Sequence, residues 1–318
     1  MAHRHALAAL IAATAAFVAP IALAASAFVN VLTGSTSSPY YPLGVALATA
    51  IGNTMPNIKT SVQATKGSVE NLNLLQAGRG ELAFALGDAL SQAWKGDEEA
   101  GFRAPLKKLR GIAAIYSNYI QIVARADSGV KTLGDLKGKR ISVGAPNSGT
   151  ELNARAVLHA AGIEYKDFAK VEYLPFGESV ELIKNRQIDA TLQSGGLGIT
   201  SIRDLAATVP TVVVPIPESV IKKINDPAYV PALIPANTYD GQPADVPTAA
   251  VQNFLVTQDG VSDDVVYGMT KALWTNLDQL VAAHPAAKAI DIHNATQAMP
   301  IPLHPGAAKY YRELGILK

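Results

Sequence analysis

The chain has no cysteine, and only 17% of its 318 residues are charged. The missing thiols exclude disulfides, zinc–thiolate sites, thiol catalysis and the acylated cysteine of a lipoprotein anchor. The charged fraction is below the usual quarter, and the two signs nearly balance, with a formal net charge of +1. Because no basic face is available to neutralise phosphates, we expect no nucleic-acid partner.

Sequence motifs for nucleotide binding and hydrolysis are also missing. The chain contains no G-x-x-x-x-G-K-[S/T] loop, no G-x-G-x-x-G after a strand, and no G-x-S-x-G elbow. The histidines lack H-E-x-x-H spacing, and we expect helix caps or surface residues at His159, His284, His293 and His304. We therefore predict no metal, no other cofactor and no enzymatic activity.

Residues 1–27 have the order of a secretory signal peptide. Arg4 precedes a stretch of Ala, Leu, Ile and Val that ends in Ala25-Ser26-Ala27. The alternative is an uncleaved signal anchor, but Pro20 and the many weakly hydrophobic alanines disfavour a stable span. We predict cleavage, a mature chain that starts near Phe28, and a soluble mature protein, since no later segment approaches 18 uninterrupted apolar residues.

After residue 28, short apolar runs alternate with helical patterns. One helical face carries Leu43, Leu47 and Ile51, and another carries Val69, Leu72 and Leu75. This alternation predicts an α/β protein built from βαβ units around a mainly parallel sheet. The strands are expected at 28–32, 82–86, 120–124, 141–143, 211–214 and 254–256.

Two pairs of segments resemble each other. Residues 67–88 and 178–196 both read as loop, Ser-Val-Glu, amphipathic helix, polar turn and buried strand. Residues 33–44, "TGSTSSPYYPLG", and 143–154, "VGAPNSGTELNA", both follow an apolar strand, carry Gly and Ser, and open a helix. Either these similarities are features that βα units have in common, or the chain forms two lobes of like topology whose loops face each other. The proline-rich stretch 215–247 is then either a crossing between lobes or a long surface loop.

The hydroxyl-rich loops suit anion binding at helix starts. Ser37 or Ser38 before Pro39 is typical of an N-cap and first helical position, and Ser148 to Glu151 has capping-box spacing. Helix N-termini expose free N–H groups and a partial positive charge, and small residues let an anion approach them. One such loop is often only a cap, but two in matching places favour a small carboxylate held between lobes.

Two further features are ambiguous on sequence grounds. Asp88 ends a buried strand on the expected cleft side, or simply caps the next helix. Tyr40 and Tyr41 wall a ligand pocket, or pack against a helix end.

Five segments together resemble the TAXI family of solute receptors, which serve tripartite ATP-independent periplasmic (TRAP) transporters. They are "TGSTSSPYYPLG", "VQATKGSVENLNLLQAGRGELAFALGDA", "GDLKGKRISVGAPNSGTELNAR", "ADVPTAAVQNFLV" and "IPLHPGAAKYYRELG". The resemblance implies a type II periplasmic-binding-protein fold, with two α/β lobes around a ligand cleft joined by crossing hinge segments. Lobe 1 would comprise residues 28–117 and 248–318, and lobe 2 residues 118–247.

The resemblance also implies which residues bind the ligand, and this chain departs from the family in places. The buried strand ends Leu86-Gly87-Asp88 where the family usually has Gln-Ser-Asp, and Asn118 stands where it often has an acid. These departures leave room for a less polar ligand, or one without an amino group. The implied binding residues are Gly34, Ser35, Thr36, Tyr40, Tyr41, Asp88, Asn147, Ser148, Gly149, Thr150, Gln193 and Ser194.

The resemblance thus predicts a periplasmic, monomeric receptor for a small carboxylate such as glutamate, glutamine or 2-oxoglutarate. Its partner would be a TRAP-type membrane permease. Two alternatives stay open: a transferase or hydrolase on the same two-lobed scaffold, for which we can nominate no nucleophile–base pair, and a module that reports ligand status to a membrane sensor.

Overall fold

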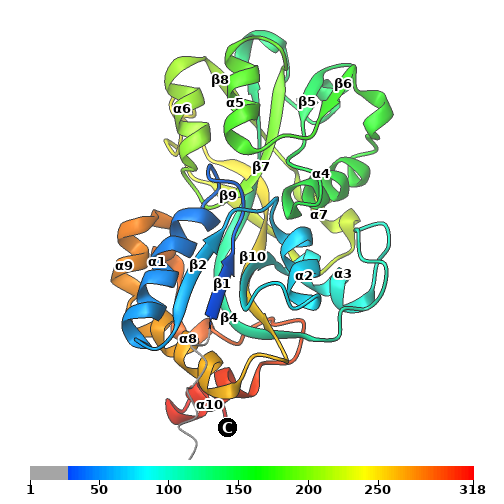
Figure 1. Ribbon diagram of the computed structural model, residues 1–318. Helices are drawn as coiled ribbons and strands as arrows, with labels where there is room; N and C mark the ends of the chain where they lie inside the picture. The colour runs from blue at the N-terminus through cyan, green and yellow to red at the C-terminus, as the bar shows by residue number, and fades with distance from the viewer. Residues whose placement is uncertain (1–27) are drawn as a thin grey trace, which may run out of the picture.

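The computed structural model describes residues 28–318 and shows two lobes, one above the other (Figure 1). The predicted signal peptide, residues 1–27, lies outside the described residues. The lower lobe, lobe 1, contains β1 (Phe28–Leu32), α1 (Tyr40–Thr54), β2 (Lys59–Gln63), α2 (Ser68–Gln76), β3 (Leu82–Leu86), α3 (Gly87–Lys95), α8 (Asp263–Thr275), α9 (Leu277–Ala283) and α10 (Pro305–Glu313).

The upper lobe, lobe 2, is built from the middle of the chain. It contains β5 (Arg140–Ser142), α4 (Gly149–Ala160), β6 (Lys170–Glu172), α5 (Phe176–Lys184), β7 (Ala190–Gly195), α6 (Thr200–Thr208), β8 (Thr211–Val214) and α7 (Glu218–Ile224). Two long strands, β4 (Leu109–Arg125) and β10 (Val246–Gln258), run between the lobes, and β9 (Tyr229–Ile234) lies beside β10.

The ten strands form one sheet whose two ends repeat the same order. The path is β2-β1-β3-β10-β4-β7-β5-β6, with β8 on β4 and β9 on β10. In lobe 1, β1 pairs in parallel with β2 and β3, and in lobe 2, β5 pairs in parallel with β6 and β7. Of the two interpretations of the repeated segments, the structure supports two lobes of like topology, because these segments occupy equivalent places in two like halves.

The sheet is mixed, and the expectation of a mainly parallel sheet is wrong. β10 runs antiparallel to β3 and β4, and β4 runs antiparallel to β7 and β8. One crossing strand carries the chain into lobe 2 and the other returns it, so the two must run in opposite directions. The parallel pairings survive only within each lobe.

Helices cover both faces of each lobe's strands, which explains the nearly continuous apolar runs. Every residue of β3 is buried. In lobe 1, one apolar cluster lies under α1 and α8 and another under α2 and α3. In lobe 2, one cluster involves α4 and α7, and the other α5 and α6. The faces predicted for the first two helices are in these clusters.

The two predicted helix caps have different outcomes. Ser148 is the N-cap of α4, and its Oγ accepts a hydrogen bond from the Glu151 N–H at 3.1 Å. α1 begins at Tyr40, with Pro39 at the N-cap position and no side-chain cap, so the serine cap predicted there is wrong. The Ser37 hydroxyl instead accepts from the Gly177 N–H of α5, across the gap between lobes.

The proline-rich stretch is neither a loop nor a crossing for most of its length. It holds α7 and β9, and the second crossing is the strand β10, which begins at Val246. Pro231 fits within β9 because this strand pairs only with β10 and is an edge strand, where a missing N–H is tolerated.

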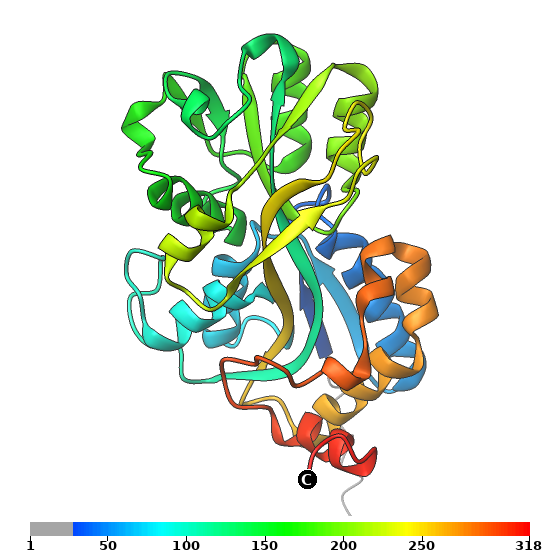
Figure 2. The same cartoon turned by 180° about the vertical axis from the view of Figure 1, so that it is seen from behind.

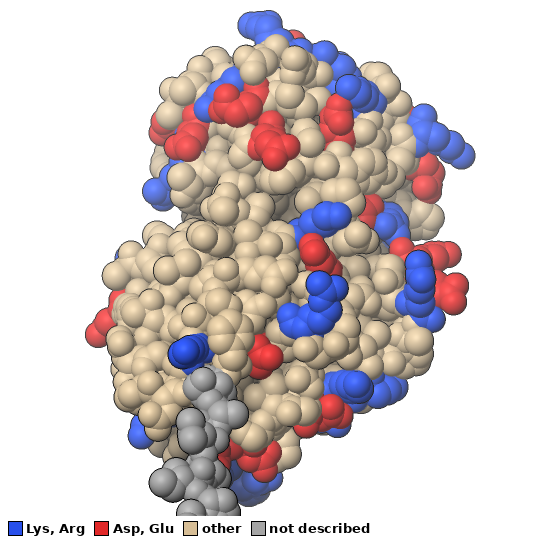
Figure 3. All heavy atoms as spheres, viewed as in Figure 1, with Lys and Arg blue, Asp and Glu red and all other residues tan. Residues whose placement is uncertain are grey.

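The lobes are joined where β4 and β10 change partners. Ile120 to Ala124 of β4 pair with β7 of lobe 2, and Asn253 to Val256 of β10 pair with β3 of lobe 1. The register between β4 and β10 shifts between Gln252 and Phe254. Irregular pairing of this kind bends a strand locally. The molecule narrows to a waist between the lobes (Figure 3).

Within residues 28–318, no helix has the length and apolar character needed to cross a membrane.

Candidate functional site

A cavity of about 90 Å³ lies between the lobes, where the loops that follow parallel strands converge. Ligands of open α/β sheets bind at this edge, outside the carboxyl ends of the strands. Its wall is formed by Gly34, Ser35, Ser38, Pro39, Tyr40, Thr65, Lys66, Gly67, Ser68, Leu86, Asn118, Ala145, Ser148, Thr150, Pro175, Phe176 and Ser194.

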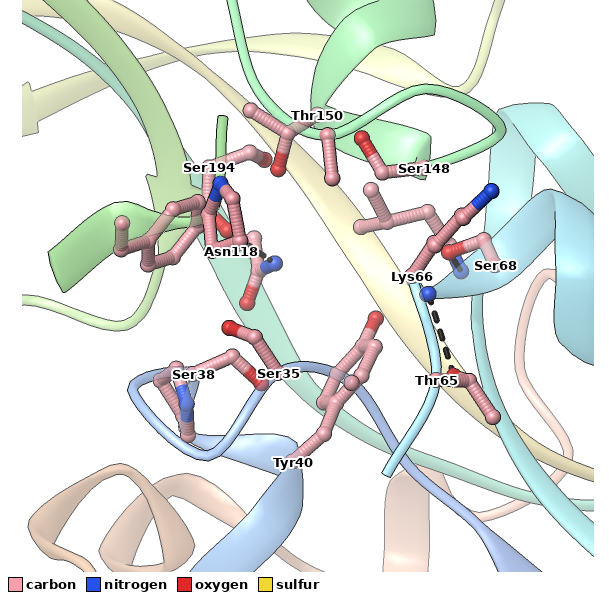
Figure 4. A pocket seen from close by; sticks show the side chains of 17 residues that line it. Ser35, Ser38, Tyr40, Thr65, Lys66, Ser68, Asn118, Ser148, Thr150 and Ser194 are labelled. Carbon is pink, nitrogen blue, oxygen red and sulfur yellow. Dashed lines mark hydrogen bonds between the residues drawn. The ribbon is translucent and has the colours of Figure 1, made fainter. Parts of the chain in front are cut away.

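Hydroxyl groups reach the cavity from both lobes. Ser35, Ser38 and Tyr40 come from the turn between β1 and α1, and Ser148 and Thr150 face them from the start of α4 (Figure 4). Most of these side chains are buried in spite of their polarity. Buried polar groups normally have hydrogen-bond partners, so their concentration around one hollow indicates a place for a polar ligand.

Five helices begin at the cavity wall. The N-cap residues of α1, α2, α3, α4 and α5 all line the hollow: Pro39, Gly67, Leu86, Ser148 and Pro175. Each helix start brings unsatisfied N–H groups and a partial positive charge. Lys66, whose side chain is exposed, is the one charged residue among the seventeen that line the cavity. The site is therefore electropositive.

Two hydroxyls at the cavity have no partner within the part of the chain that the structure describes. Ser38 Oγ, from lobe 1, and Ser194 Oγ, from β7 of lobe 2, are buried without a hydrogen bond. An unmade hydrogen bond of a buried hydroxyl costs about 1–3 kcal/mol. Both groups are therefore available to a bound molecule.

A hydrogen-bond chain forms the floor of the cavity and crosses both hinge strands. The Tyr40 hydroxyl donates to Asn253 Oδ1, and Asn253 Nδ2 donates to Asn118 Oδ1 at 2.8 Å. Asn118 Nδ2 then donates to the Ser194 carbonyl at 2.9 Å. Burial raises the pKa of Tyr40 above its usual range, so this phenol stays protonated and keeps its donor role. The floor thus ties α1 to β10, β4 and β7.

The lobes touch around the cavity, which makes this the closed form. The Glu70 N–H of α2 donates to the Asn147 carbonyl of lobe 2 at 3.1 Å, and the Gly177 N–H donates to Ser37 Oγ at 3.1 Å. Gly149, at the start of α4, lies directly against Ser68 and Leu86 of lobe 1. Contacts on several sides enclose the hollow.

The structure brings part of the predicted binding set to the cavity and leaves part of it elsewhere. Gly34, Ser35, Tyr40, Ser148, Thr150 and Ser194 line the wall. Thr36, Tyr41, Asp88, Asn147, Gly149 and Gln193 do not.

The residues away from the wall have other contacts. Thr36 faces a separate groove beside α5 and α6. Gln193 is fully buried, and its side chain bonds to Ser201 and to the Phe176 carbonyl. Asn147 adopts a left-handed backbone conformation, with φ 59°, and its carbonyl serves the contact with Glu70.

Asp88 makes a contact between lobes instead of facing the cavity. Its side chain is fully buried, and Oδ2 accepts from Asn153 Nδ2 at 2.7 Å and from the Tyr229 hydroxyl at 2.6 Å. Its Oδ1 has no partner within residues 28–318. Burial raises the pKa of this carboxyl to about 6, the Tyr229 hydrogen bond opposing the shift. Asp88 therefore joins α3 of lobe 1 to α4 and β9.

Sequence reasoning missed two parts of the wall. Thr65 to Ser68 precede and open α2, and Pro175 with Phe176 opens α5. The signal for both was the internal repeat, since the two segments that share Ser-Val-Glu begin at these helix starts. Equivalent helices in two facing lobes point their N-termini at the same cleft.

The histidines have the structural roles that were expected. His284 and His304 accept backbone N–H bonds as caps of a 3-10 helix and of α10, while His159 and His293 are exposed. Among residues 28–318, no group of three or more His, Asp or Glu side chains is placed to hold a metal ion.

Solved structures of the same fold support the architecture. The periplasmic binding protein BugD matches with a TM-score of 0.60 at 12% identity, over 92% of this chain and 99% of that chain. A protein described as a periplasmic transporter matches at 0.56 and 12% identity, over 91% and 93%. A putative L-cystine ABC transporter from Listeria monocytogenes matches at 0.50 and 15% identity, over 85% and 98%. The chain thus has the type II periplasmic-binding-protein fold.

The family is shown by a separate match. The sequence model of the NMT1-like family matches residues 31–315, which is nearly all of the described chain. The narrower resemblance to TAXI receptors stays a prediction. The chain therefore belongs to the NMT1-like family.

Proposed function

We propose that this protein is a periplasmic, monomeric solute receptor that captures a small carboxylate between its lobes. The observation that carries this proposal is the convergence of five helix N-termini and several hydroxyls on one cavity, with Lys66 as its single charged residue. A helix N-terminus is a ready site for an anion, and a small cavity of about 90 Å³ suits a small molecule.

Capture would proceed by closure about the two crossing strands. We propose residues 28–117 with 248–318 as one moving unit and 118–247 as the other, hinged near Asn118 and Asn253. The ligand first meets Ser35, Ser38 and Ser68 on lobe 1, and closure adds Ser148 and Thr150. Removing water from the cleft strengthens each charge–dipole interaction inside it, because the local dielectric constant falls.

The closed receptor would deliver its ligand to a TRAP-type permease, as the five TAXI-like segments suggest. An ABC-type permease is the competing partner, since one protein of the same fold is named for an ABC transporter. Proteoliposomes holding either type of permease from the same cell distinguish them. Uptake that depends on the receptor and on an ion gradient supports the TRAP assignment, whereas uptake that depends on ATP contradicts it.

Ligand binding itself is tested with residues 28–318, unfolded and refolded to remove any carried-over ligand. Thermal unfolding is then followed with small carboxylates, with sugars and cations as controls. A ligand at about 100 times its Kd adds roughly 2.7 kcal/mol of stability, a shift of several degrees. A shift with one carboxylate and no turnover of that compound supports a receptor. No shift with any carboxylate, on demonstrably folded protein, contradicts the proposal, and turnover favours the transferase or hydrolase alternative.

A further inference from the structure

We infer that the cavity selects carboxylates that lack an ammonium group, such as 2-oxo acids, hydroxy acids and dicarboxylates, over amino acids. This inference rests on the proposed function and narrows it. It follows from where the acidic side chains around the site point, and from which hydrogen atoms of the lining hydroxyls are still free.

Four helices around the cleft carry an acid in their first turn, and none of these acids lines the cavity. The residues are Glu70 of α2, Asp88 of α3, Glu151 of α4 and Glu178 of α5. Acids at these positions stabilise the helix starts. Any one of them turned inward would provide the negative partner that a ligand ammonium group requires when it is buried.

Three of these carboxylates are held by other partners. Glu70 Oε2 accepts from the Lys66 N–H at 2.8 Å. Glu151 binds Arg155 at 2.6 Å and the Tyr165 hydroxyl at 2.9 Å, on the outer side of α4. Asp88 binds Asn153 and Tyr229, and Glu178 is exposed. Glu70, Asp88 and Glu151 cannot rotate into the cavity without breaking these contacts. Glu178 is the exception.

Two hydroxyls on the wall, those of Ser68 and Ser148, already accept a backbone N–H. Ser68 Oγ accepts from the Leu86 N–H at 3.1 Å, and Ser148 Oγ accepts from the Glu151 N–H at 3.1 Å. Neither hydroxyl donates to an acceptor among residues 28–318, so each hydrogen can point into the cavity. A carboxylate or keto oxygen accepts such hydrogens, whereas an ammonium group only donates.

Asn118, an amide on the wall, already makes two hydrogen bonds. Its Oδ1 accepts from Asn253 Nδ2, and its Nδ2 donates to the Ser194 carbonyl. A neutral amide oxygen, even with a lone pair left, carries no charge to balance an ammonium group. Because no acid lines the wall, a buried ammonium group would meet five positive helix ends and Lys66 without a carboxylate to compensate it. Burying a charge without a partner is strongly unfavourable.

The test compares ligand pairs that differ at the ammonium-bearing carbon. We would titrate refolded protein calorimetrically with 2-oxoglutarate and L-glutamate, pyruvate and L-alanine, and succinate and L-aspartate. The ammonium-free member of at least one pair should bind ten-fold or more tightly than its amino acid. Equal or tighter binding of the amino acid overturns this inference but leaves carboxylate capture standing. If neither member of any pair binds, the proposed function fails and the inference fails with it.

A variant that adds a negative charge provides an independent readout. Ser35→Asp places a carboxylate on the half-buried part of the wall, and Ala64→Asp places the same charge on an exposed residue beside the cleft. Ser35→Asp should weaken 2-oxoglutarate binding more than glutamate binding and so lower their affinity ratio, while Ala64→Asp should leave the ratio unchanged. An unchanged ratio in Ser35→Asp, in protein that retains binding of either ligand, contradicts the inference.

Discussion

At the scale of single residues, Asp88 is a titratable group that joins the lobes away from the cavity. It is fully buried, is held by Asn153 and Tyr229, and feels the negative charge of Asp226. Its pKa of about 6 in the closed form is above the value near 3.9 that an exposed Asp has. The closed form therefore binds a proton more tightly than an open form in which Asp88 meets water.

This difference predicts that ligand affinity rises as the pH falls. Because the closed-form pKa is the higher one, closure is favoured below about pH 6 and loses this contribution as the pH rises through 6. We expect Kd to fall about tenfold between pH 7.5 and pH 5, measured with a ligand whose own pKa values lie lower. The same sign holds for folding, since the unfolded carboxyl also has a pKa near 3.9.

The matched variant for this prediction is Asp88→Asn, which keeps the shape and removes the titration. Its affinity should vary little over the same pH range. A wild-type protein whose Kd is flat from pH 7.5 to pH 5, or a variant with the same slope, would show that Asp88 does not link closure to protonation.

At the scale of elements, the start of α4 approaches lobe 1 so closely that only glycine fits. A Cβ on Gly149 would lie 2.6 Å from Ser68 Oγ and 2.7 Å from Leu86 Cδ1. Both atoms belong to lobe 1, so the conflict exists only when the lobes are closed. α4 can therefore begin at the cavity because its first residue has no side chain.

Gly149→Ala should accordingly hinder closure and leave each lobe intact. Overpacking typically costs about 1–3 kcal/mol, which corresponds to a loss of affinity of roughly 5- to 150-fold. Calorimetric titration measures this loss, and the melting temperature without ligand should change little. Gly134→Ala is the control, because that glycine is exposed and its Cβ would meet only Thr132 Oγ1 at 3.7 Å. Wild-type affinity in Gly149→Ala would rule out this close approach.

The elements themselves were largely predictable from the sequence, for a local reason. β1, β3 and β8 begin and end where the apolar runs predict. Of these three strands only β3 is buried along its whole length, which accounts for its continuous apolar run. β2, β6 and β9 were missed. Their residues are mostly half-buried or exposed, and all three strands lie at or near sheet edges, so their pattern is weak. The α1 cap was misplaced because Ser37 binds the other lobe.

At the scale of the whole molecule, the closed form can be locked by a single engineered bond. An ideal Cβ on Gly177 would lie 3.5 Å from Ser37 Cβ, on the opposite lobe. Disulfides need Cβ atoms about 3.5–4.5 Å apart. Because the chain has no cysteine of its own, no other thiol competes.

The double variant Ser37→Cys with Gly177→Cys should cross-link when oxidised. Ligand loaded before oxidation should then be retained through dialysis and released by a reductant, while unloaded, oxidised protein should bind ligand much more slowly. The two single variants are the controls and should exchange ligand at equal rates with and without reductant. An oxidised double variant that exchanges ligand as fast as its reduced form would show that the lobes need not separate for binding.

The sequence by itself determined the α/β class, the similarity of the repeated segments and the start of α4 at Ser148. These features depend on periodicity, turn residues and caps, which act over a few neighbouring residues. The tertiary structure decided which hydroxyls face the cavity, that Asp88 bridges the lobes, and that the acids at the helix starts point away from it. Side-chain direction depends on residues far apart in the chain, such as Asn253 beneath Tyr40 and Ser37 against Gly177, and no local pattern records those partners.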